Sequence, residues 1–471
     1  MANDALAQRL AVARESGGFR PEVIDALRVH LSQAPDEQVF RMSPLRYAAS
    51  AGLSENEAIS LFLHATRAGV LDFTWGVLCG ACGAFLTTAP ALRSLTGTRV
   101  CTMCEIDAPV SDDSVEVGFT LSPAIRRLRF LDPATLDLPR DWKTLFFSPS
   151  RIMPQHLERM LAGIVVETRL LRSGEEVTLQ QQLSGKRFAL FVPAHHAWAH
   201  VDVREDAADS RLSFDLLDGK FVPSRVSMKP GPATLEISNR SATSAVMAFV
   251  HNLVPPPEER KGMFPVLELR PYLTGKRLVT HQTFRDLFRA ESIPSEGGLE
   301  FKSLTLLFTD LKGSTEMYER IGDFRAYSLV RQHFQLLREI IASRGGSMVK
   351  TIGDAVMASF SEAAPALAAA AEMNRQIQRV GDGKELQLKI GLHAGPCIAV
   401  ESNERLDYFG QTVNIAARVQ GVAAANEIVI TEQVLGAPGA REVIAAAALS
   451  SRPDRAVLKG VDGEFTLYRL Q

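Results

Sequence analysis

Long apolar runs are missing from this sequence of 471 residues. No stretch approaches the roughly 20 apolar residues that cross a bilayer, and the start, MANDALAQRLAVARESGG, lacks the basic beginning and apolar core of a signal peptide. We therefore expect a soluble, cytoplasmic protein that does not bind membranes. A charge excess is missing as well, since 52 Lys and Arg stand against 54 Asp and Glu. This balance argues against nucleic acid as a bulk electrostatic partner.

Cysteine is scarce, and its placement is informative. Four of the five cysteines form two CxxC pairs, and only Cys397 lies elsewhere. The pairs are separated by eighteen residues, which suits metal ligation better than a disulfide framework and matches the spacing of a zinc ribbon. We expect one structural Zn2+ per chain, bound by Cys79, Cys82, Cys101 and Cys104. The alternatives are the same fold without bound metal and a redox-active dithiol.

The first part of the chain has helical patterns with short breaks. The last of them opens with a capping box, in which Ser54 and Glu57 would satisfy free backbone N–H groups. The patterns run into an apolar strand that ends near Trp75, so we predict a winged-helix-like unit over residues 1–75 and the zinc ribbon over 76–110. The predicted helices span residues 4–15, 21–33, 43–50 and 54–69.

Residues 111–275 show short alternating runs separated by turn clusters, which is typical of a β-sandwich, and we expect a β-rich regulatory domain there. Proline-rich and glycine-rich stretches at 255–260 and 294–298 are candidate hinges. A linker helix is expected at 276–298, with the main domain boundary near residue 298. Between residues 41 and 107, five arginines are balanced by five acids, so DNA binding by the winged-helix and ribbon pair is not expected.

The pattern after residue 300 carries the chemistry. An apolar strand ends at Asp310, two short strands enclose a tight turn with Asp354, and a strand pair at 386–401 flanks His393-Ala394-Gly395-Pro396. A loop then enters a helix on which Asn414 and Arg418, four residues apart, share a face. The element order βαββαββαβ predicts a ferredoxin-like α+β fold with an extended sheet. The whole chain is thus expected to be a multidomain α+β protein.

Residues 299–471 resemble the class III adenylate and guanylate cyclase catalytic domain, which makes a cyclic nucleotide and pyrophosphate from a nucleoside triphosphate. Several separate motifs carry this resemblance, in the order of the family. They are Phe308-Thr309-Asp310-Leu311, Lys350-Thr351-Ile352-Gly353-Asp354, Asp407-Tyr408-Phe409-Gly410, Asn414 with Arg418, and Leu458-Lys459-Gly460.

The resemblance implies a metal site. Asp310, the backbone of Leu311 and Asp354 would hold two Mg2+ or Mn2+ ions per active site, one polarising the attacking 3'-oxygen and the other clamping the phosphates. Two carboxylates that each follow an apolar strand suit this two-metal logic. The start of the next helix, Gly313-Ser314-Thr315, offers backbone N–H groups to the triphosphate.

The resemblance also implies the contacts to the nucleotide. Lys350 would donate to adenine N1 and Asp407 would accept from its amino group, so ATP is favoured over GTP. Asn414 is assigned to the ribose, and Arg418 and Lys459 to the phosphates, where cations stabilise the charge that grows in the transition state.

In this family the metals and the base are bound by different subunits, so a chain with one catalytic module implies a symmetric homodimer. The N-terminal half is similar to an uncharacterised region found ahead of some bacterial soluble cyclase domains, which implies a regulatory role in signal transduction with an unknown ligand. The sequence thus predicts an adenylate cyclase, a phosphorus–oxygen lyase. The alternatives are a guanylate or low-selectivity cyclase, and a catalytically silent dimerisation module on a zinc-ribbon binding protein.

Overall fold

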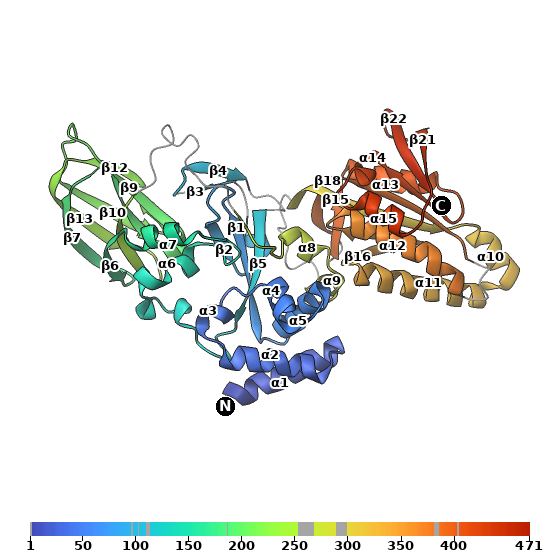
Figure 1. Cartoon of the computed structure of the whole chain (residues 1–471), viewed down its shortest axis with the longest axis horizontal. Coiled ribbons are helices and arrows are strands. Elements are labelled where there is room, and N and C mark those ends of the chain that lie inside the picture. Colours follow the sequence, from blue (N-terminus) through green and yellow to red (C-terminus); the bar gives the residue numbers. More distant parts are fainter. Residues whose placement is uncertain are drawn as a thin grey trace. The chain divides into compact units, whose positions relative to one another are not determined.

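The chain folds into two compact units, an N-terminal unit of residues 1–110 and 114–273 and a C-terminal unit of residues 274–471 (Figure 1). The predicted hinges at 255–260 and 294–298, and the boundary near 298, lie outside the described residues. The computed structural model describes residues 2–95, 98–101, 103–109, 114–185, 187–252, 268–288, 299–380, 386–402 and 405–471.

The N-terminal unit begins with helices at the positions that the sequence predicts. The Ser54 hydroxyl accepts a hydrogen bond from the Glu57 backbone N–H at 3.2 Å, as expected for the capping box. A short helix between the second and third predicted ones is the only addition among the described residues before Leu71. The helices are α1 (Ala2–Gly17), α2 (Pro21–Gln33), α3 (Asp36–Val39), α4 (Pro44–Ala51) and α5 (Glu55–Arg67).

These helices lead into a three-stranded antiparallel sheet in the order β2-β1-β5, formed by β1 (Leu71–Leu78), β2 (Phe85–Ala89) and β5 (Val115–Leu121). Strand β5 comes from the region that the sequence analysis places in the β-rich domain, yet all seven of its residues pair with β1. Both faces of β5 are buried, including its polar residues Glu116 and Thr120. The winged-helix arrangement is not confirmed, because the sheet takes a strand from beyond the cysteine pairs.

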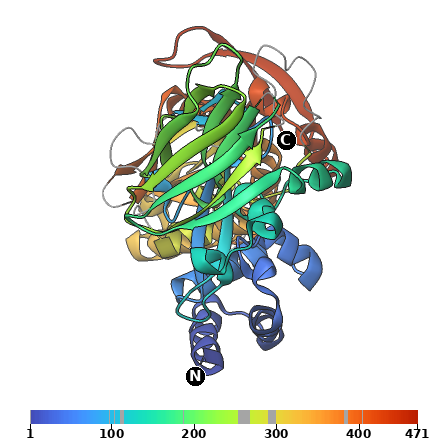
Figure 2. The ribbon, with the colours of Figure 1, turned by 90° about the vertical axis from the view of Figure 1, so that its left-hand side faces the viewer.

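Two sheets form a β-sandwich after helices α6 (Leu138–Phe146) and α7 (Gln155–Ala162) (Figure 2). One sheet has the order β11-β10-β13-β7 and the other β12-β9-β8-β14-β6. Side chains from both sheets, such as Phe214 and Phe249, share one core, as the alternating pattern predicts. The strands are β6 (Val165–Leu171), β7 (Glu176–Leu183), β8 (Arg187–Val192), β9 (Ala197–Val203), β10 (Arg211–Leu217), β11 (Lys220–Val222), β12 (Arg225–Met228), β13 (Gly231–Asn239) and β14 (Ala245–His251).

The C-terminal unit opens with two short helices, α8 (Gly275–Val279) and α9 (Gln282–Phe288), where one linker helix over 276–298 is predicted. Its large sheet has the order β16-β17-β15-β18-β20-β22-β21, and β19 also pairs with β18. The strands are β15 (Leu299–Leu311), β16 (Ser347–Ile352), β17 (Ala355–Phe360), β18 (Leu388–Ser402), β19 (Arg405–Phe409), β20 (Glu427–Thr431), β21 (Ser451–Val457) and β22 (Glu464–Leu470).

Two hydrophobic cores hold helices against this sheet. The larger core joins strand residues to α11 and α12, and the smaller one joins them to α13 through Ile415 and Val419. Helix α13 approaches β18 so closely that a Cβ at Gly391 would lie 2.1 Å from the Gln420 backbone nitrogen. The helices are α10 (Ser314–Ile321), α11 (Asp323–Ser343), α12 (Ala363–Gln376), α13 (Gln411–Gly421), α14 (Glu432–Leu435) and α15 (Ala440–Ala446).

The predicted strand pair at 386–401 is wrong in one respect, since β18 is a single strand of 15 residues. Pro396 lacks the N–H that a central strand needs, which is why the sequence suggests a break. In the structure, Pro396 lies opposite an irregularity in the pairing between Phe301 and Leu304 of β15. A bulge of this kind leaves a position without ladder hydrogen bonds, so the strand continues through the proline.

Among the described residues, no helix is both long and apolar enough to cross a membrane.

Candidate functional site

Asp310 and Asp354 lie at the same end of the central sheet. Asp310 is near the end of β15, and Asp354 lies in the two-residue turn between β16 and β17. Because Thr309 pairs with Val356, the turn lies beside the end of β15. The turn requires Gly353, whose φ of 61° is in the left-handed region. The register of three strands therefore brings the two predicted metal ligands together.

The electrostatics of this acid pair fit a divalent cation. Burial raises the pKa of the Asp310 carboxyl, and the negative charge of Asp354 raises it further, while Lys389 opposes both effects. One carboxylate oxygen of Asp354, Oδ2, is buried and has no hydrogen-bond partner among the described residues. A buried carboxylate oxygen without a partner beside a second carboxylate is costly unless a cation is bound. Oxygen ligands of this kind are those that Mg2+ and Mn2+ prefer.

A buried histidine behind the acid pair was missed by sequence analysis. His333 lies on the buried face of α11, and burial lowers its pKa to about 4 although Asp354 opposes the shift. Neither ring nitrogen has a hydrogen-bond partner among the described residues. Its position on an apolar helix face gives no signal in the sequence that separates it from a core residue.

The predicted phosphate-binding turn lies directly after β15. Gly313 is the N-cap of α10, and Ser314 and Thr315 form the first turn of that helix. Gly313 has no side chain that could cap the helix, so a capping side chain does not cover the first N–H groups. The turn can thus present backbone donors to an anion beside the acid pair.

Lys350 and Asp407, the predicted base-reading pair, are brought together from two different strands. Lys350 Nζ on β16 donates to Asp407 Oδ2 on β19 at 2.6 Å. The other oxygen of Asp407 accepts from the Tyr408 backbone N–H at 2.9 Å. The Lys350 side chain is 43% exposed and that of Asp407 14%, so both can be reached from solvent.

The strands that carry this pair are held by helix α9. The Gln282 side-chain oxygen accepts from the Met348 backbone N–H at 2.8 Å, two residues before Lys350. The Arg285 guanidinium donates to the Leu406 carbonyl, next to Asp407, and lies 5.8 Å from the centre of the Tyr408 ring. Helix α9 therefore contacts both strands that present the pair, although the sequence analysis assigns no role to it.

Tyr408 of β19 is hydrogen-bonded to β17 and, through Ser359, is linked to β16. Its hydroxyl accepts from the Ser359 hydroxyl of β17 at 3.3 Å, and burial raises its pKa. The Ser359 hydroxyl also contacts that of Ser347 at 3.1 Å. These buried hydroxyls fix β19 relative to β16 and β17.

The remaining predicted residues face solvent. Asn414 and Arg418 lie on the exposed side of α13, opposite the buried Ile415 and Val419. Lys459 is exposed in the turn between β21 and β22. Within the described part of the unit, no side-chain hydrogen bond or ion pair holds any of the three, so all three are available to a ligand or to another chain.

The four paired cysteines form a cluster in the N-terminal unit. Cys79 and Cys82 lie in the connection between β1 and β2, and Cys101 and Cys104 lie at the hairpin of β3 (Thr98–Cys101) and β4 (Ile106–Pro109). All four are buried, and their sulfur atoms lie within 4.8 Å of one another.

The chemistry of this cluster fits a metal ion. Hydrogen bonding among the sulfurs, chiefly to Cys101, raises the pKa of the Cys82 and Cys104 thiols and lowers that of Cys79. Four thiolates so close together would repel one another, and a bound cation removes this repulsion. The cluster can therefore hold a metal ion, and its identity as zinc stays a prediction.

Two family models match the chain. Residues 3–286 match a family of unknown function (DUF5939), which covers more than half of the chain. The chain belongs to this family. Residues 299–470 match the adenylate and guanylate cyclase catalytic domain, and the C-terminal unit is a class III cyclase catalytic domain, as the motifs predict. The first family therefore extends into helix α9.

Curated proteins that resemble this chain include several adenylate cyclases. The chain is 26% identical over 245 residues to a pH-sensitive adenylate cyclase of Mycobacterium tuberculosis, covering 52% of this chain and 56% of that one. It is 28% identical over 195 residues to an adenylate cyclase of Anabaena cylindrica, covering 37% and 38% of the two chains. It is 33% identical over 155 residues to an adenylate cyclase of Mycosarcoma maydis, covering 28% and 6%. The chain thus spans from 6% to 56% of these relatives' length.

Solved structures with similar parts include the adenylyl cyclase CyaB of P. aeruginosa, with a TM-score of 0.32 and 23% identity over 36% of this chain and 94% of that chain. A guanylyl cyclase domain of the RhoGC fusion protein of Blastocladiella emersonii gives a TM-score of 0.31 and 22% identity over 36% and 97%. The assignment of the catalytic domain rests on the family model and the motifs.

Proposed function

We propose that this protein is an adenylate cyclase that converts ATP to 3',5'-cyclic AMP and pyrophosphate. The observation that carries this proposal is the Lys350–Asp407 pair, whose atoms lie 2.6 Å apart within a class III cyclase domain. A cation donor beside a carboxylate acceptor matches the Watson–Crick edge of adenine, where N1 accepts and the amino group donates. Guanine presents the opposite order, so this pair favours ATP.

The acid pair is the proposed metal site. Asp310, Asp354 and the backbone carbonyl of Leu311 would hold Mg2+ or Mn2+, ions that supply Lewis acidity and neutralise phosphate charge when bound. The chain's own residues do the rest. Gly313, Ser314 and Thr315 present N–H groups to the phosphates, Asn414 orients the ribose, and Arg418 and Lys459 stabilise the charge that develops as pyrophosphate leaves.

The exposure of three proposed site residues supports a homodimer. Asn414, Arg418 and Lys459 face solvent in one chain, whereas the Asp310 carboxyl is partly desolvated. A symmetric dimer lets the exposed residues of one subunit complete the site that holds the acid pair of the other. Each dimer would then contain two equivalent sites.

The N-terminal unit is proposed to regulate this activity and to carry one structural Zn2+ on Cys79, Cys82, Cys101 and Cys104. The close approach and burial of the four sulfurs support the zinc site. Helix α9 supports the regulatory role. The N-terminal family model includes Gln282 and Arg285, and these two side chains bind the backbone of the strands that carry Lys350 and Asp407.

The deciding experiment measures cAMP and cGMP formation by the purified full-length chain with Mg2+ and with Mn2+. We expect ATP turnover that depends on a divalent ion and exceeds GTP turnover. The double substitution Lys350→Glu with Asp407→Ser reverses the donor and acceptor, and should lower ATP turnover while raising that of GTP relative to it. Absence of both products with both ions would overturn the proposal and favour the silent-module alternative. Equal use of ATP and GTP would indicate a low-selectivity cyclase.

A further inference from the structure

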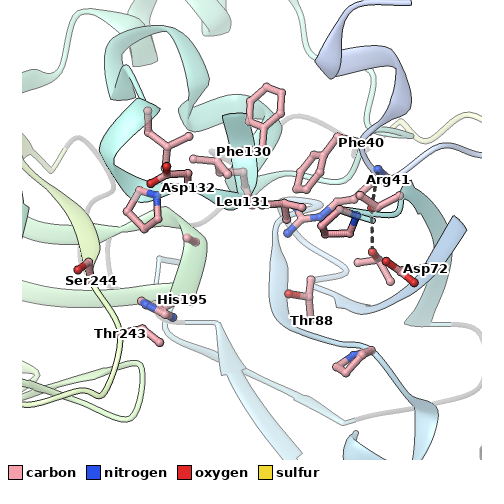
Figure 3. A pocket seen from close by; sticks show the side chains of 18 of the residues that line it. Phe40, Arg41, Asp72, Thr88, Phe130, Leu131, Asp132, His195, Thr243 and Ser244 are labelled. Atoms are coloured by element: carbon pink, nitrogen blue, oxygen red, sulfur yellow. Dashed lines mark hydrogen bonds between the residues drawn. The ribbon is translucent and has the colours of Figure 1, made fainter. Parts of the chain in front are cut away.

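The N-terminal unit contains a cavity of about 1040 Å3 that the proposed catalytic site does not use (Figure 3). Its walls come from the segment after α3, from strands β1, β2 and β5, from the turns after β5, and from loops of the β-sandwich. A cavity of this size lies at the upper end of the range for small-molecule sites. Residues 130–136 contribute the most, and the other lining residues come from stretches that lie far apart in the sequence.

One wall of the cavity is apolar and aromatic. The rings of Phe40 and Phe130 stack with centroids 5.0 Å apart and an interplanar angle of 23°. Leu131, the next residue, is 47% exposed although it is large and apolar. Figure 3 shows Phe40, Phe130 and Leu131 close together along this wall. Phe40 and Phe130 are only 7% and 5% exposed, so Leu131 supplies most of the apolar surface that a ligand body would remove from water here.

Arg41 supplies a buried positive charge beside that wall. The residue is only 7% exposed, and its guanidinium carbon lies 4.8 Å from the centres of both the Phe40 and the Phe85 rings. Nη1 donates to the Leu145 and Thr144 carbonyls at 2.9 and 3.3 Å. Nε has no hydrogen-bond partner, and in the described residues no carboxylate forms an ion pair with this guanidinium. Buried charges are normally paired, so this group lacks a counter-ion.

Glu116 is the acid whose charge acts on Arg41, but its carboxylate is hydrogen-bonded to other residues. Its two carboxylate oxygens accept hydrogen bonds from the Ser148 and Ser150 hydroxyls. Burial raises the pKa of Glu116, while these hydrogen bonds and the charges of Arg46 and Arg41 oppose the shift. Arg41 itself stays cationic at neutral pH, because burial lowers its pKa only to about 10.

The backbone of Arg41 is strained and held in place. Its φ of 53° lies in the left-handed region, which arginine rarely adopts. The Arg41 N–H donates to the Thr120 hydroxyl at 3.1 Å, and Met42 exchanges two backbone hydrogen bonds with Phe119 of β5. Strained residues that are fixed by their surroundings cluster at ligand sites.

We propose that this cavity binds a small monoanionic amphiphile, whose carboxylate or sulfonate pairs with Arg41 and whose apolar or aromatic body packs against Phe40, Phe130 and Leu131. The charges at the rim limit the ligand to one anionic group. Asp72 and Asp132 are exposed there and would repel a second negative charge, although Arg172 offsets part of this effect. The site is independent of the cyclase chemistry proposed above.

The test uses two fluorescent probes on the full-length chain. 1-Anilinonaphthalene-8-sulfonate carries the anionic group, and N-phenyl-1-naphthylamine has the same ring body without it. We expect Arg41→Met to weaken binding of the anionic probe by roughly tenfold or more, as for a lost hydrogen bond to a charged group, and to change binding of the neutral probe by less than about twofold. Arg46→Met is the matched control, because this substitution removes the same charge from a residue that does not line the cavity.

A second variant keeps the charge and changes the apolar wall. Leu131→Trp starts from an exposed position and places a bulkier ring system where the ligand body would pack, so both probes should bind with changed affinity while circular dichroism and the thermal midpoint stay unchanged. This result does not depend on whether Arg41→Met folds. The proposal is overturned if Arg41→Met and Arg46→Met affect the anionic probe equally, or if Leu131→Trp leaves the affinity of both probes unchanged.

Discussion

The C-terminal unit keeps the charged residues of its proposed site at strand ends, in turns and on an exposed helix face, whereas the N-terminal unit buries its notable ones. Asp354 lies in a turn and Arg418 on the exposed side of α13. Arg41, Glu116 and the four paired cysteines are each less than a tenth exposed. The catalytic residues of the C-terminal unit and the cysteines of the N-terminal unit can thus be recognised from motifs, whereas the burial of Arg41 and Glu116 is known only from the fold.

This difference reflects two ways of building a site. In the catalytic unit, short motifs each place one polar group after an apolar strand, and the sheet register brings the groups together. In the N-terminal unit, the cavity takes its walls from many separate segments with ordinary composition. The five predictions below test the comparison, in order of decreasing effect.

The largest effect is expected when the acid pair is removed. Asp310→Ala or Asp354→Ala should lower cyclase activity at least about a thousandfold, because each removes a proposed ligand of ions that stabilise several kcal/mol of transition-state charge. The fold should persist, since neither side chain fills a hydrophobic core. The measurement is cAMP formation with Mg2+ and Mn2+, and Glu442→Ala, an exposed acid on α15, is the control. Turnover with normal metal dependence in either variant would contradict the assignment.

Mixing two inactive variants tests whether the exposed residues serve another chain. Asp310→Ala and Arg418→Ala homodimers should both be inactive, yet a mixed dimer places both lesions in one site and leaves the other intact. Random exchange makes about half the dimers mixed, so activity should recover to roughly a quarter of wild type. The readout is cAMP after co-expression, with each variant alone as the control. No recovery despite proven mixed dimers would mean that both residues serve one site of the same chain.

The cysteine cluster tests whether burial in the N-terminal unit serves stability. Cys79→Ser or Cys101→Ser should lower bound zinc from about one ion per chain and make the N-terminal unit sensitive to protease, because metal binding contributes to folding. Cys397→Ser, which makes the same change in the catalytic unit, is the matched control. Elemental analysis of protein purified without chelators gives the metal content. The structural zinc site would be contradicted if the wild-type protein contained no zinc, or if Cys397→Ser lost as much zinc as the cluster variants.

A substitution in helix α9 tests whether the contacts of this helix position the strands that carry Lys350 and Asp407. Arg285→Ala should lower kcat/KM for ATP about tenfold through a raised KM, because the Leu406 carbonyl loses a charged donor and Asp407 loses its fixed position. The ratio of ATP to GTP turnover should fall as well, and Arg285→Lys should restore part of it. Arg331→Ala, an exposed arginine on α11, is the control. An unchanged ratio would reduce α9 to a packing element.

The smallest effect concerns stability at low pH in the catalytic unit. His393 is buried against the Thr431 hydroxyl at 2.9 Å, and burial lowers its pKa to about 4. Unfolded histidine takes up a proton near pH 6.5 and the folded one does not, so stability falls as the pH drops below that value. Between pH 7 and 5 the loss should be about 2 kcal/mol. Hydrogen exchange in β18 measures it, and in His393→Gln the difference between the two pH values should shrink by that amount.

Part of the fold could be predicted because its signals are local. The helix beginning at Ser54 is marked by its cap, and the strand ending at Asp310 by a continuous apolar run. The winged-helix prediction is not confirmed, because β5, which follows both cysteine pairs in the chain, joins the sheet of β1 and β2. The predicted break at Pro396 failed because a bulge on the neighbouring strand accommodates the proline. Both points depend on which strands pair, and local patterns do not specify pairing partners.

The sequence by itself determined the catalytic family, the metal and nucleotide residues to be tested, and the four cysteines of the cluster, because motif spacing encodes each of them. Only the tertiary structure decided that Gln282 and Arg285 hold the strands of Lys350 and Asp407. It also decided that Arg41 lies buried beside a large cavity without a carboxylate partner among the described residues. The physical reason is that hydrogen bonds and burial depend on which distant segments pack together, and that information is not contained in any one segment.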